Sequence, residues 1–350
     1  MTMLAELVEV VIGIDTHKHT HTAAVVQAAT GAVLAQVTVN ADSDGYAELE
    51  ALAQQQHPRS RAWALEGSGG YGAGLTRHLT EHGELVIELD RPVRPKRRGG
   101  AKSDPIDAVR AARDALARTQ LAQPKTGAER AALQMHLTAR RAAVEAGADA
   151  QRQLHALIVT APERVRSKFR GRSTRVMITT AHGLRTPRTG DAELTAAITV
   201  LRALARRIRF LEAEALGHEQ TIRTLVRSWR PDLLKLPGVG PIVAATVLTS
   251  WSHAGRCRDE AAFAMLAGTA PIPASSGQTV RYRLNRSGDR QLNRALHVIT
   301  LSRLRYDPAT RDYADRRQAE GRSSREIQRC LKRYIGRQLY RHLEAGLTAA

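Results

Sequence analysis

The first 90 residues alternate between short apolar runs and helical patterns, and this order restricts the fold more than any other feature of the chain. Three runs of apolar and β-branched residues come first, and two more follow, each after a helical pattern. A glycine, Gly31, favours a hairpin between the second and third runs. The predicted strands are 6–14, 22–28, 32–39, 61–66 and 84–89, and the predicted helices are 44–56 and 73–82.

A basic segment, RPVRPKRRGGAK, separates the last strand from a helix that is predicted to begin near Asp104. The resulting order is three strands, helix, strand, helix, strand, helix. That is the order of a ribonuclease-H-like α/β domain, although other mixed α/β folds share it. We therefore predict such a domain for residues 1–125.

The remainder of the chain is predicted to be helical. Residues 127–160 contain no proline and little glycine and predict one long helix, whereas 162–190 resemble a basic loop. Residues 191–228 are helical again, with a heptad seam that favours a coiled coil over 126–230, within one chain or between two. The seam consists of Leu194, Ile198, Leu201, Ala205 and Ile208. Residues 231–350 form a third, mainly α module with helices near 289–305 and 323–343.

Charge is distributed unevenly along the chain. The whole protein carries 53 basic and 34 acidic residues, a net charge of +19. Residues 1–90 have a net charge of −8, whereas residues 281–342 have a net charge of +11. So large a positive excess indicates a nucleic-acid partner. An acidic module can approach a phosphate backbone where a metal ion bridges carboxylate and phosphate.

Four carboxylates stand at places that suit a metal site. Asp15 follows an apolar strand in IGIDTHK, and Glu66 ends another strand in ALEGSGGYG. Asp104 and Asp107, in KSDPIDA, lie three residues apart at a predicted helix start and therefore share one face. Asp104 has a second interpretation, as the N-cap of a helix with Pro105 at its first position.

Carboxylates that converge without basic neighbours repel one another, and hard divalent cations remove that repulsion. We therefore predict that Asp15, Glu66, Asp104 and Asp107 bind Mg²⁺, with Mn²⁺ as a substitute. Two such ions can activate a nucleophile and stabilise a leaving oxygen in phosphoryl transfer. The alternating His17, His19 and His21 are assigned surface or substrate contacts in preference to a metal site of their own.

A second group of residues lies in 270–295. Ser275 and Ser276 precede Gly277 in a proline-bounded loop, which is also common in simple turns. Basic residues follow, and with a serine hydroxyl beside them they could hold a phosphate and form a phosphoserine ester. These are Arg281, Arg283, Arg286, Arg290 and Arg294.

Two further features of 231–350 suit nucleic acid. The PGVGP turn at 237–241 resembles a helix-hairpin-helix element, whose glycines let backbone amides approach a phosphate, but similar turns simply connect helices. An arginine row at i, i+4 spacing marks one face of the last helix, and the alternative for it is a solvated face. The row contains Arg325, Arg329, Arg333, Arg337 and Arg341.

These motifs, in this order, resemble the DEDD-type insertion-sequence transposases, a recombinase family with bridge-RNA-guided members. GIDTHK, ALEGSGGYG and KSDPIDA resemble the motifs of their RuvC-like N-terminal domain. KLPGVGP, the ASSG serine and NRSGDRQLNRAL resemble their C-terminal transposase domain. The resemblance covers nearly the whole chain.

The resemblance implies a recombinase that excises and inserts DNA. Asp15, Glu66, Asp104 and Asp107 would be its metal tetrad, and Ser276 its nucleophile, with Ser275 as the neighbouring alternative. It also implies a composite site, in which the tetrad of one subunit meets the serine of another within a dimer or tetramer. A structured guide RNA is implied by the resemblance alone.

Two other classes of function fit the composition. A structure-specific endonuclease resembling a junction resolvase would use the tetrad with water and no serine. A non-catalytic nucleic-acid-binding protein would explain the charge but not the four acids. The expected location is the cytoplasm, associated with the nucleoid, because no signal peptide or membrane-spanning run is evident and there are only two cysteines.

Overall fold

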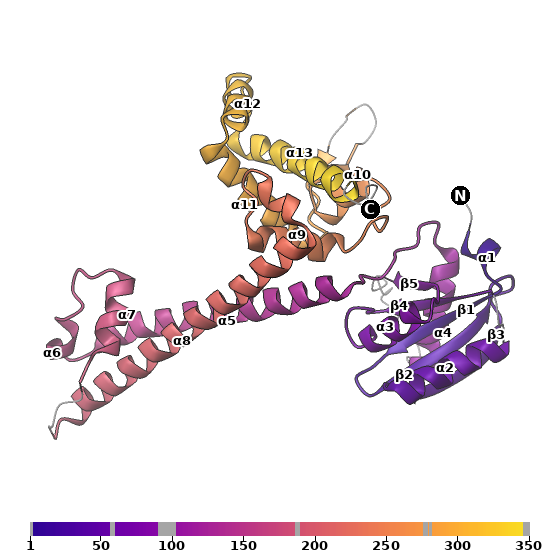
Figure 1. The fold of residues 1–350 in the computed structure, drawn as a ribbon, viewed down its shortest axis with the longest axis horizontal. Helices are drawn as coiled ribbons and strands as arrows, with labels where there is room; N and C mark the ends of the chain where they lie inside the picture. Colours follow the sequence, from indigo (N-terminus) through magenta and orange to yellow (C-terminus); the bar gives the residue numbers. More distant parts are fainter. Residues whose placement is uncertain are drawn as a thin grey trace. The chain divides into compact units, whose positions relative to one another are not determined.

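The computed structural model describes residues 3–56, 60–89, 103–185, 190–275, 279 and 282–345. Contacts divide the chain into two compact units, residues 1–126 and 127–350 (Figure 1). Each unit has its own apolar core. The predicted boundary between 126–230 and 231–350 falls inside the second unit and stays a prediction.

The N-terminal unit contains a five-stranded sheet in the order β3-β2-β1-β4-β5. Strand β2 is antiparallel to β1 and β3, whereas β1, β4 and β5 are parallel. This order and these directions agree with the predicted ribonuclease-H-like fold. The strands are β1 (Val10–Thr16), β2 (Thr20–Gln27), β3 (Val33–Asn40), β4 (Arg61–Glu66) and β5 (Val86–Leu89).

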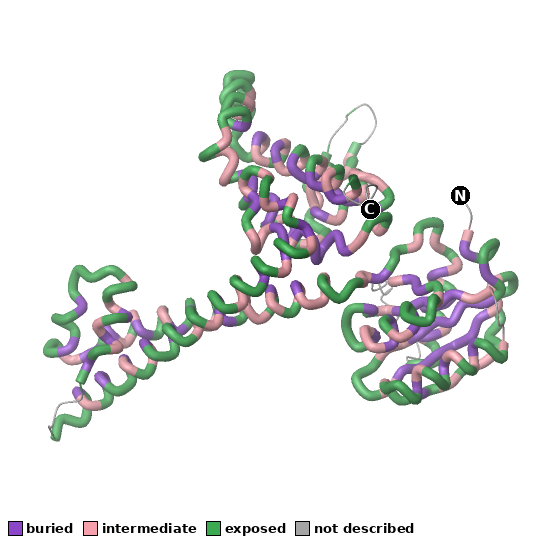
Figure 2. The backbone as a smooth tube through the Cα atoms, viewed as in Figure 1, coloured by how far each residue is buried: buried purple, intermediate pink, exposed green. Residues whose placement is uncertain are grey.

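Helices cover both faces of this sheet. Leu49 of α2 and Leu75 of α3 pack with Trp63 on one face, and Ala112 of α4 packs with Val11 on the other. Figure 2 shows buried residues along the strands of this sheet. The central strands are therefore buried on both sides, as their continuous apolar sequence requires. The helices are α1 (Leu4–Leu7), α2 (Ser43–Gln56), α3 (Ala73–Glu81) and α4 (Asp104–Ala117).

Two predicted boundaries in this unit are wrong. The run 6–14 is not one strand, because Leu4–Leu7 form helix α1 with Leu4 fully buried, and β1 begins at Val10. Strand β1 also continues through Asp15 to Thr16 because both residues pair with β2. Helix α4 begins at Asp104, and the carbonyl of Ser103 accepts its first helical hydrogen bonds from Ile106 and Asp107. Ser103, not Asp104, is therefore the N-cap.

The C-terminal unit is built on two long helices, α5 (Ala128–Thr160) and α8 (Ala192–Trp229), which pack along each other within one chain. Arg140 forms an ion pair with Glu219 across them, at 3.0 Å, and Gln151 meets Glu212 further along, so the two helices are antiparallel. The heptad seam of α8 is buried in this contact.

The interval 162–190 was predicted to be a loop, and that prediction is wrong for two segments. Helices α6 (Glu163–Arg166) and α7 (Thr174–His182) form there. Val165, Ile178 and Phe169, which lies in the turn after α6, are buried against α5 and α8. A few apolar side chains among many arginines are sufficient to hold this segment in place, because α5 and α8 offer them an apolar surface.

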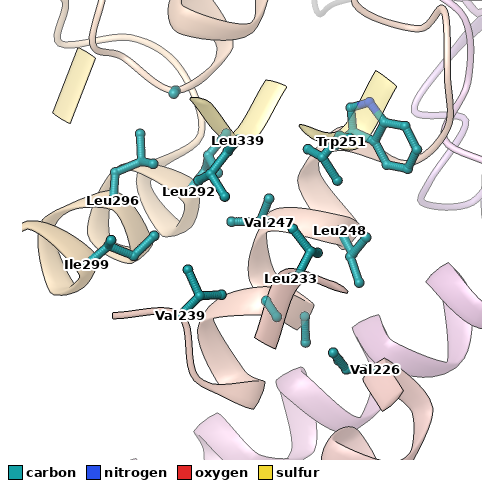
Figure 3. Close-up of a cluster of buried hydrophobic side chains, with 14 of the residues drawn as sticks. Val226, Leu233, Val239, Val247, Leu248, Trp251, Leu292, Leu296, Ile299 and Leu339 are labelled. Atoms are coloured by element: carbon teal, nitrogen blue, oxygen red, sulfur yellow. The ribbon is translucent and has the colours of Figure 1, made fainter. Parts of the chain in front are cut away.

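A second core lies where α8 meets the last third of the chain (Figure 3). Val226 of α8, Val247 of α9, Leu296 of α11 and Leu339 of α13 point into it. The elements here are η1 (Pro231–Lys235), α9 (Pro241–Trp251), α10 (Glu260–Leu266), β6 (Ile272–Pro273), β7 (Tyr282–Arg283), α11 (Arg290–Tyr306), α12 (Pro308–Ala319) and α13 (Ser324–Ala345). None of the helices in the described part of the chain is long and apolar enough to span a membrane.

Arg230 joins the end of α8 to the end of α13. Its side chain is 11% exposed, and its guanidinium donates to the carbonyls of Leu343 (3.1 Å) and His342 (2.9 Å) and forms an ion pair with Asp232 at 2.8 Å. The hydrogen bond from Arg230 lowers the pKa of Asp232. Asp232 therefore stabilises the folded state fully at pH values above its pKa in the unfolded chain. This stabilisation is lost as the pH falls through the lower pKa that Asp232 has in the folded state.

We expect Arg230→Met to lower the free energy of unfolding of this unit by about 2–4 kcal/mol, because two carbonyls lose their donor and Asp232 keeps only His342 as a partner among the described residues. We expect Asp232→Asn to destabilise less at pH 7 and to flatten the loss of stability below pH ~4. Urea unfolding at several pH values measures both effects. An Asp232→Asn variant whose stability falls with acid as steeply as that of the parent would contradict the assignment.

Candidate metal centre and basic pockets

The four predicted acids lie at one end of the sheet, on the face that α4 covers. Asp15 and Glu66 each stand one position beyond the paired residues Ile14 and Leu65 of the parallel strands β1 and β4. Gly13 and Asp15 project to the same face because alternate residues of a strand do so. Asp104 and Asp107 occupy the first turn of α4, above Ala108, which packs on this face.

Gly13 determines how closely α4 approaches β1. A β-carbon at Gly13 would lie 2.1 Å from the carbonyl oxygen of Ala108 and 2.5 Å from the amide nitrogen of Ala112. Both contacts are to backbone, which cannot rotate away. A glycine is therefore required here, and the first turn of α4 is held at the level of Asp15.

Asp15 and Asp104 converge through a histidine. His17 Nε2 lies 3.2 Å from Asp15 Oδ2 and 3.4 Å from Asp104 Oδ1. One ligand atom from each of the three residues lies within 4.8 Å of the others. Of the alternating histidines, only His17 joins the acids, whereas His21 is fully buried beneath α2 on the opposite face.

The electrostatics of Asp15 reflect this crowding. Burial raises the pKa of Asp15, the nearby His17 lowers it in part, and the negative charges of Asp104 and Asp107 raise it further. A carboxylate with a raised pKa among other carboxylates is a group that a cation would stabilise. The oxygen-rich set therefore fits a hard divalent ion.

The other two predicted acids, Asp107 and Glu66, lie near Asp15 and have contacts of their own. Asp107 is close enough to affect Asp15, but its carboxylate pairs with Arg110 on the next turn of α4. Glu66 lies in the strand beside Asp15, and its backbone carbonyl accepts a hydrogen bond from Thr16 Oγ1 at 3.1 Å. Neither residue belongs to the three-residue group of Asp15, His17 and Asp104.

Five of the predicted arginines line a pocket of about 550 Å³ between the start of α11 and α13. Asp289 caps α11 by accepting from the amides of Gln291 and Leu292, and the pocket opens beside this first turn. Lys332 lies at its edge and donates to Asn293 Oδ1 at 2.9 Å. The five are Arg286, Arg290, Arg294, Arg325 and Arg329.

A second pocket of about 770 Å³ lies next to the first and shares Arg286 and Arg329 with it. Arg283, Arg333 and Arg337 also line it. The two arginine runs, which are some forty residues apart in sequence, therefore meet in space. Burial and the charge of Arg329 lower the pKa of Lys332, as expected where positive charge is concentrated.

The last arginine row is balanced in part by an acid from outside its helix. Glu260 of α10 contacts Arg333, Arg337 and Arg341 at 3.5, 2.9 and 3.7 Å. The last three arginines of the row are therefore paired with an acid that their own helix does not supply. Within the described residues, Arg325 and Arg329 form no ion pair, and both are exposed beside the first pocket.

For the loop that contains Ser275 and Ser276, the structure describes mainly the residues on either side. Strands β6 and β7 form a short antiparallel ribbon, and Ser275 follows β6 as an exposed residue. Ser276 and Arg281 lie outside the described residues. In the PGVGP turn, Gly238 has φ +78° and its missing β-carbon would meet Ile299 and Ser302 of α11. That glycine thus serves packing against α11.

A mixed sheet in this strand order with acids at one end, followed by a helical unit with basic pockets, is the arrangement expected of a DEDD-type protein. Residues 12–161 match the model of an IS110-type DEDD family described as "Transposase", and residues 231–315 match that of the "Transposase IS116/IS110/IS902 family". The chain belongs to the IS110 family of insertion-sequence transposases.

Two curated relatives support this assignment. One is the insertion element IS900 uncharacterized 42 kDa protein of Mycobacterium paratuberculosis, 33% identical over 135 residues. The other is the insertion element IS110 uncharacterized 43.6 kDa protein of Streptomyces coelicolor, 31% identical over 140 residues. These matches cover 36% and 39% of this chain, and only 33% of the length of either relative.

Proposed function

We propose that this protein is a transposase that cuts and rejoins DNA at a metal-dependent site. The observation that carries the proposal is the convergence of Asp15 and Asp104, with Asp107 beside them, at the end of β1 in a member of this family. An acidic cluster that exists only for folding would not gather like charges around a half-buried carboxylate.

Asp15, Glu66, Asp104 and Asp107 would hold the metal, with Mg²⁺ as the expected ion and Mn²⁺ as a substitute. The carboxylate oxygens suit a hard cation, and an imidazole as close as His17 is a better ligand for Mn²⁺ than for Mg²⁺. When bound, such an ion neutralises charge on the reacting phosphate. The role of the chain is to fix these ligands on two strand ends and one helix.

Ser276 is the proposed nucleophile. Its hydroxyl oxygen would attack the phosphorus of a DNA phosphodiester and lose its proton, and the bond from phosphorus to one deoxyribose oxygen would break. The phosphoserine ester keeps the energy of that bond, so a second hydroxyl can rejoin the DNA without another energy source. Ser275 is the adjacent alternative.

The two basic pockets of the second unit are proposed to hold phosphates of nucleic acid. Arg286, Arg290, Arg294, Arg325 and Arg329 are exposed and line one of them, which favours contact with a polyanion over a purely structural role. We propose DNA as one partner and a structured guide RNA as another. The turn at 237–241 is a further proposed phosphate contact, of the helix-hairpin-helix kind, at Gly240, where a β-carbon would meet nothing within 4 Å.

The proposed assembly is a dimer or tetramer, in which the acids of one subunit meet the serine of another. Exposed apolar side chains along the long helices, including Phe210 (68% exposed) and Met135 (68% exposed), offer a surface for such association. Sedimentation of the full-length protein with and without nucleic acid measures this state directly.

Ser276→Ala tests the proposed chemistry. The protein is incubated with DNA carrying both element ends and a target, together with RNA transcribed from the element's non-coding flank, and is then denatured. We expect a covalent protein–DNA adduct with the parent and with the matched control Ser275→Ala. For Ser276→Ala we expect no adduct and a loss of recombination of at least about 10³-fold.

The outcome also separates the alternative function. If Ser276→Ala still cuts DNA at the parental rate and leaves free ends with no adduct, the protein is a metal-dependent endonuclease that uses water. If the adduct moves to Ser275, the nucleophile is misassigned but the class of reaction stands.

A further inference from the structure

A second cluster of metal-ligating side chains lies on the opposite face of the N-terminal sheet from the acids. Glu50 comes from α2, His78 from the last turn of α3, and His82 is the C-cap residue of α3. His78 Nε2 lies 3.1 Å from Glu50 Oε2, and His82 Nδ1 lies 2.8 Å from the same oxygen. One ligand atom from each residue lies within 4.8 Å of the others.

We propose that Glu50, His78 and His82 form a zinc site that joins α2 to α3. Two imidazole nitrogens and one carboxylate oxygen are a donor set that Zn²⁺ prefers, and a fourth position remains for water. The site is separate from the oxygen-rich cluster around Asp15, which suits a harder ion.

The distances fit a tetrahedral ion after small movements. Zinc bonds of about 2.1 Å place neighbouring ligand atoms about 3.4 Å apart. The two histidine–carboxylate separations are 3.1 and 2.8 Å, so outward shifts of a few tenths of an ångström admit the ion. Histidines four residues apart on a helix lie one above the other, which brings the rings of His78 and His82 to a centroid separation of 4.3 Å.

The surroundings favour a cation and hold the ligands in place. The C-terminus of a helix carries partial negative charge, and both histidines lie at that end of α3. Tyr46, one turn before Glu50 on α2, stacks on His21 at a centroid separation of 5.8 Å and lies tilted against His78 at 5.6 Å. Gly74 admits the Tyr46 hydroxyl, since a β-carbon there would lie 2.4 Å from it. The gap between α2 and α3 is therefore fixed.

The three proposed ligands differ in their exposure to solvent, as a site that an ion can enter requires. The side chains of Glu50 and His78 are 19% and 22% exposed, whereas His82 is 52% exposed. Two ligands are therefore held by packing and the third can close from solvent over the ion. The rival interpretation is a hydrogen-bonded cluster in which protonated histidines share one carboxylate, with no metal.

Zinc titration of the full-length protein decides between these interpretations. Metal-stripped protein is dialysed against Zn²⁺ in excess Mg²⁺, which occupies the oxygen-rich site, and bound zinc is counted by elemental analysis. We expect one Zn²⁺ per chain for the parent and for Asp15→Asn, which removes a ligand of the other site. We expect roughly 100-fold weaker binding for His78→Gln and for His82→Gln.

His19→Ala is the matched control, because His19 is exposed in the same unit and outside the cluster. Its zinc binding should equal that of the parent. Zinc should also raise the melting temperature of the parent and Asp15→Asn but not that of His82→Gln, whose half-exposed position leaves the fold intact. Zinc binding by the two glutamine variants that equals the parent's, or no binding in the Asp15→Asn background, overturns the proposal.

Discussion

Replacing Asp15 with asparagine is expected to reduce metal-dependent DNA cleavage by at least about 10³-fold while leaving the protein folded. Asparagine keeps the size of the side chain and removes the charge. Asp15 is the residue on which the others converge, with His17 at 3.2 Å and the charges of Asp104 and Asp107 near enough to raise its pKa. The measurement is the rate of strand cleavage with element-end DNA in saturating Mg²⁺.

Asp114→Asn is the matched control for this prediction. Asp114 belongs to the same helix as Asp104 but pairs with Arg118 one turn further on, at 2.7 Å. Its substitution should leave the cleavage rate within about twofold and the stability within about 1 kcal/mol, as for a partly exposed i, i+4 pair. Equal loss of cleavage in both variants would assign the effect to the fold and not to a metal ligand.

Removing charge from Asp15 should also relieve repulsion in the metal-free protein. The pKa of this carboxyl is raised by burial first, so its ionised form opposes folding at neutral pH. The asparagine variant should therefore be at least as stable as the parent when no metal is present. Loss of activity together with unchanged or increased stability would be difficult to explain for a residue with a purely structural role.

The N-terminal unit could be predicted from sequence in its element order, because strand and helix periods alternate clearly there. Its first element could not, because a short apolar run has no period that separates helix from strand. The buried position of Leu4, which decides in favour of α1, depends on residues far along the chain. The capping alternative for Asp104 could not be removed from sequence either, since Ser103 and Asp104 are both good capping residues.

The interval 162–190 shows where composition misleads. Its arginines, serines and threonines suggest a loop, yet Phe169 is 1% exposed because α5 and α8 provide a surface for it. The same limit applies to charge. Few acids accompany the arginine row within α13, but Glu260 reaches it from α10.

The candidate sites were predictable to different degrees. The acids at the ends of β1 and β4 could be placed because parallel strands end at the same edge of a sheet. The role of His17 could not be fixed, since three alternating histidines of one strand would share a face. In the structure β1 ends at Thr16 and β2 begins at Thr20, so His17 and His19 lie in the turn and only His21 lies in a strand. The Glu50–His78–His82 cluster was not predictable because Glu50 comes from a different helix and an i, i+4 histidine pair is common.

The last prediction concerns Gly13, which lies in the motif GIDTHK and links the fold to the site. A methyl group at this position would overlap the backbone of Ala108 and Ala112, so α4 must move away from β1. We expect Gly13→Ala to cost roughly 3 kcal/mol or more in the free energy of unfolding of the N-terminal unit. The control is Gly69→Ala, because a β-carbon at Gly69 meets nothing within 4 Å and its φ is not positive. Urea unfolding measures the stability of both variants.

Under conditions in which Gly13→Ala remains folded, its cleavage rate should still fall, because Asp104 and Asp107 move with α4 while Asp15 stays on β1. A variant that is destabilised yet cleaves at the parental rate when folded would show that the packing of α4 on Gly13 does not set the geometry of the acids.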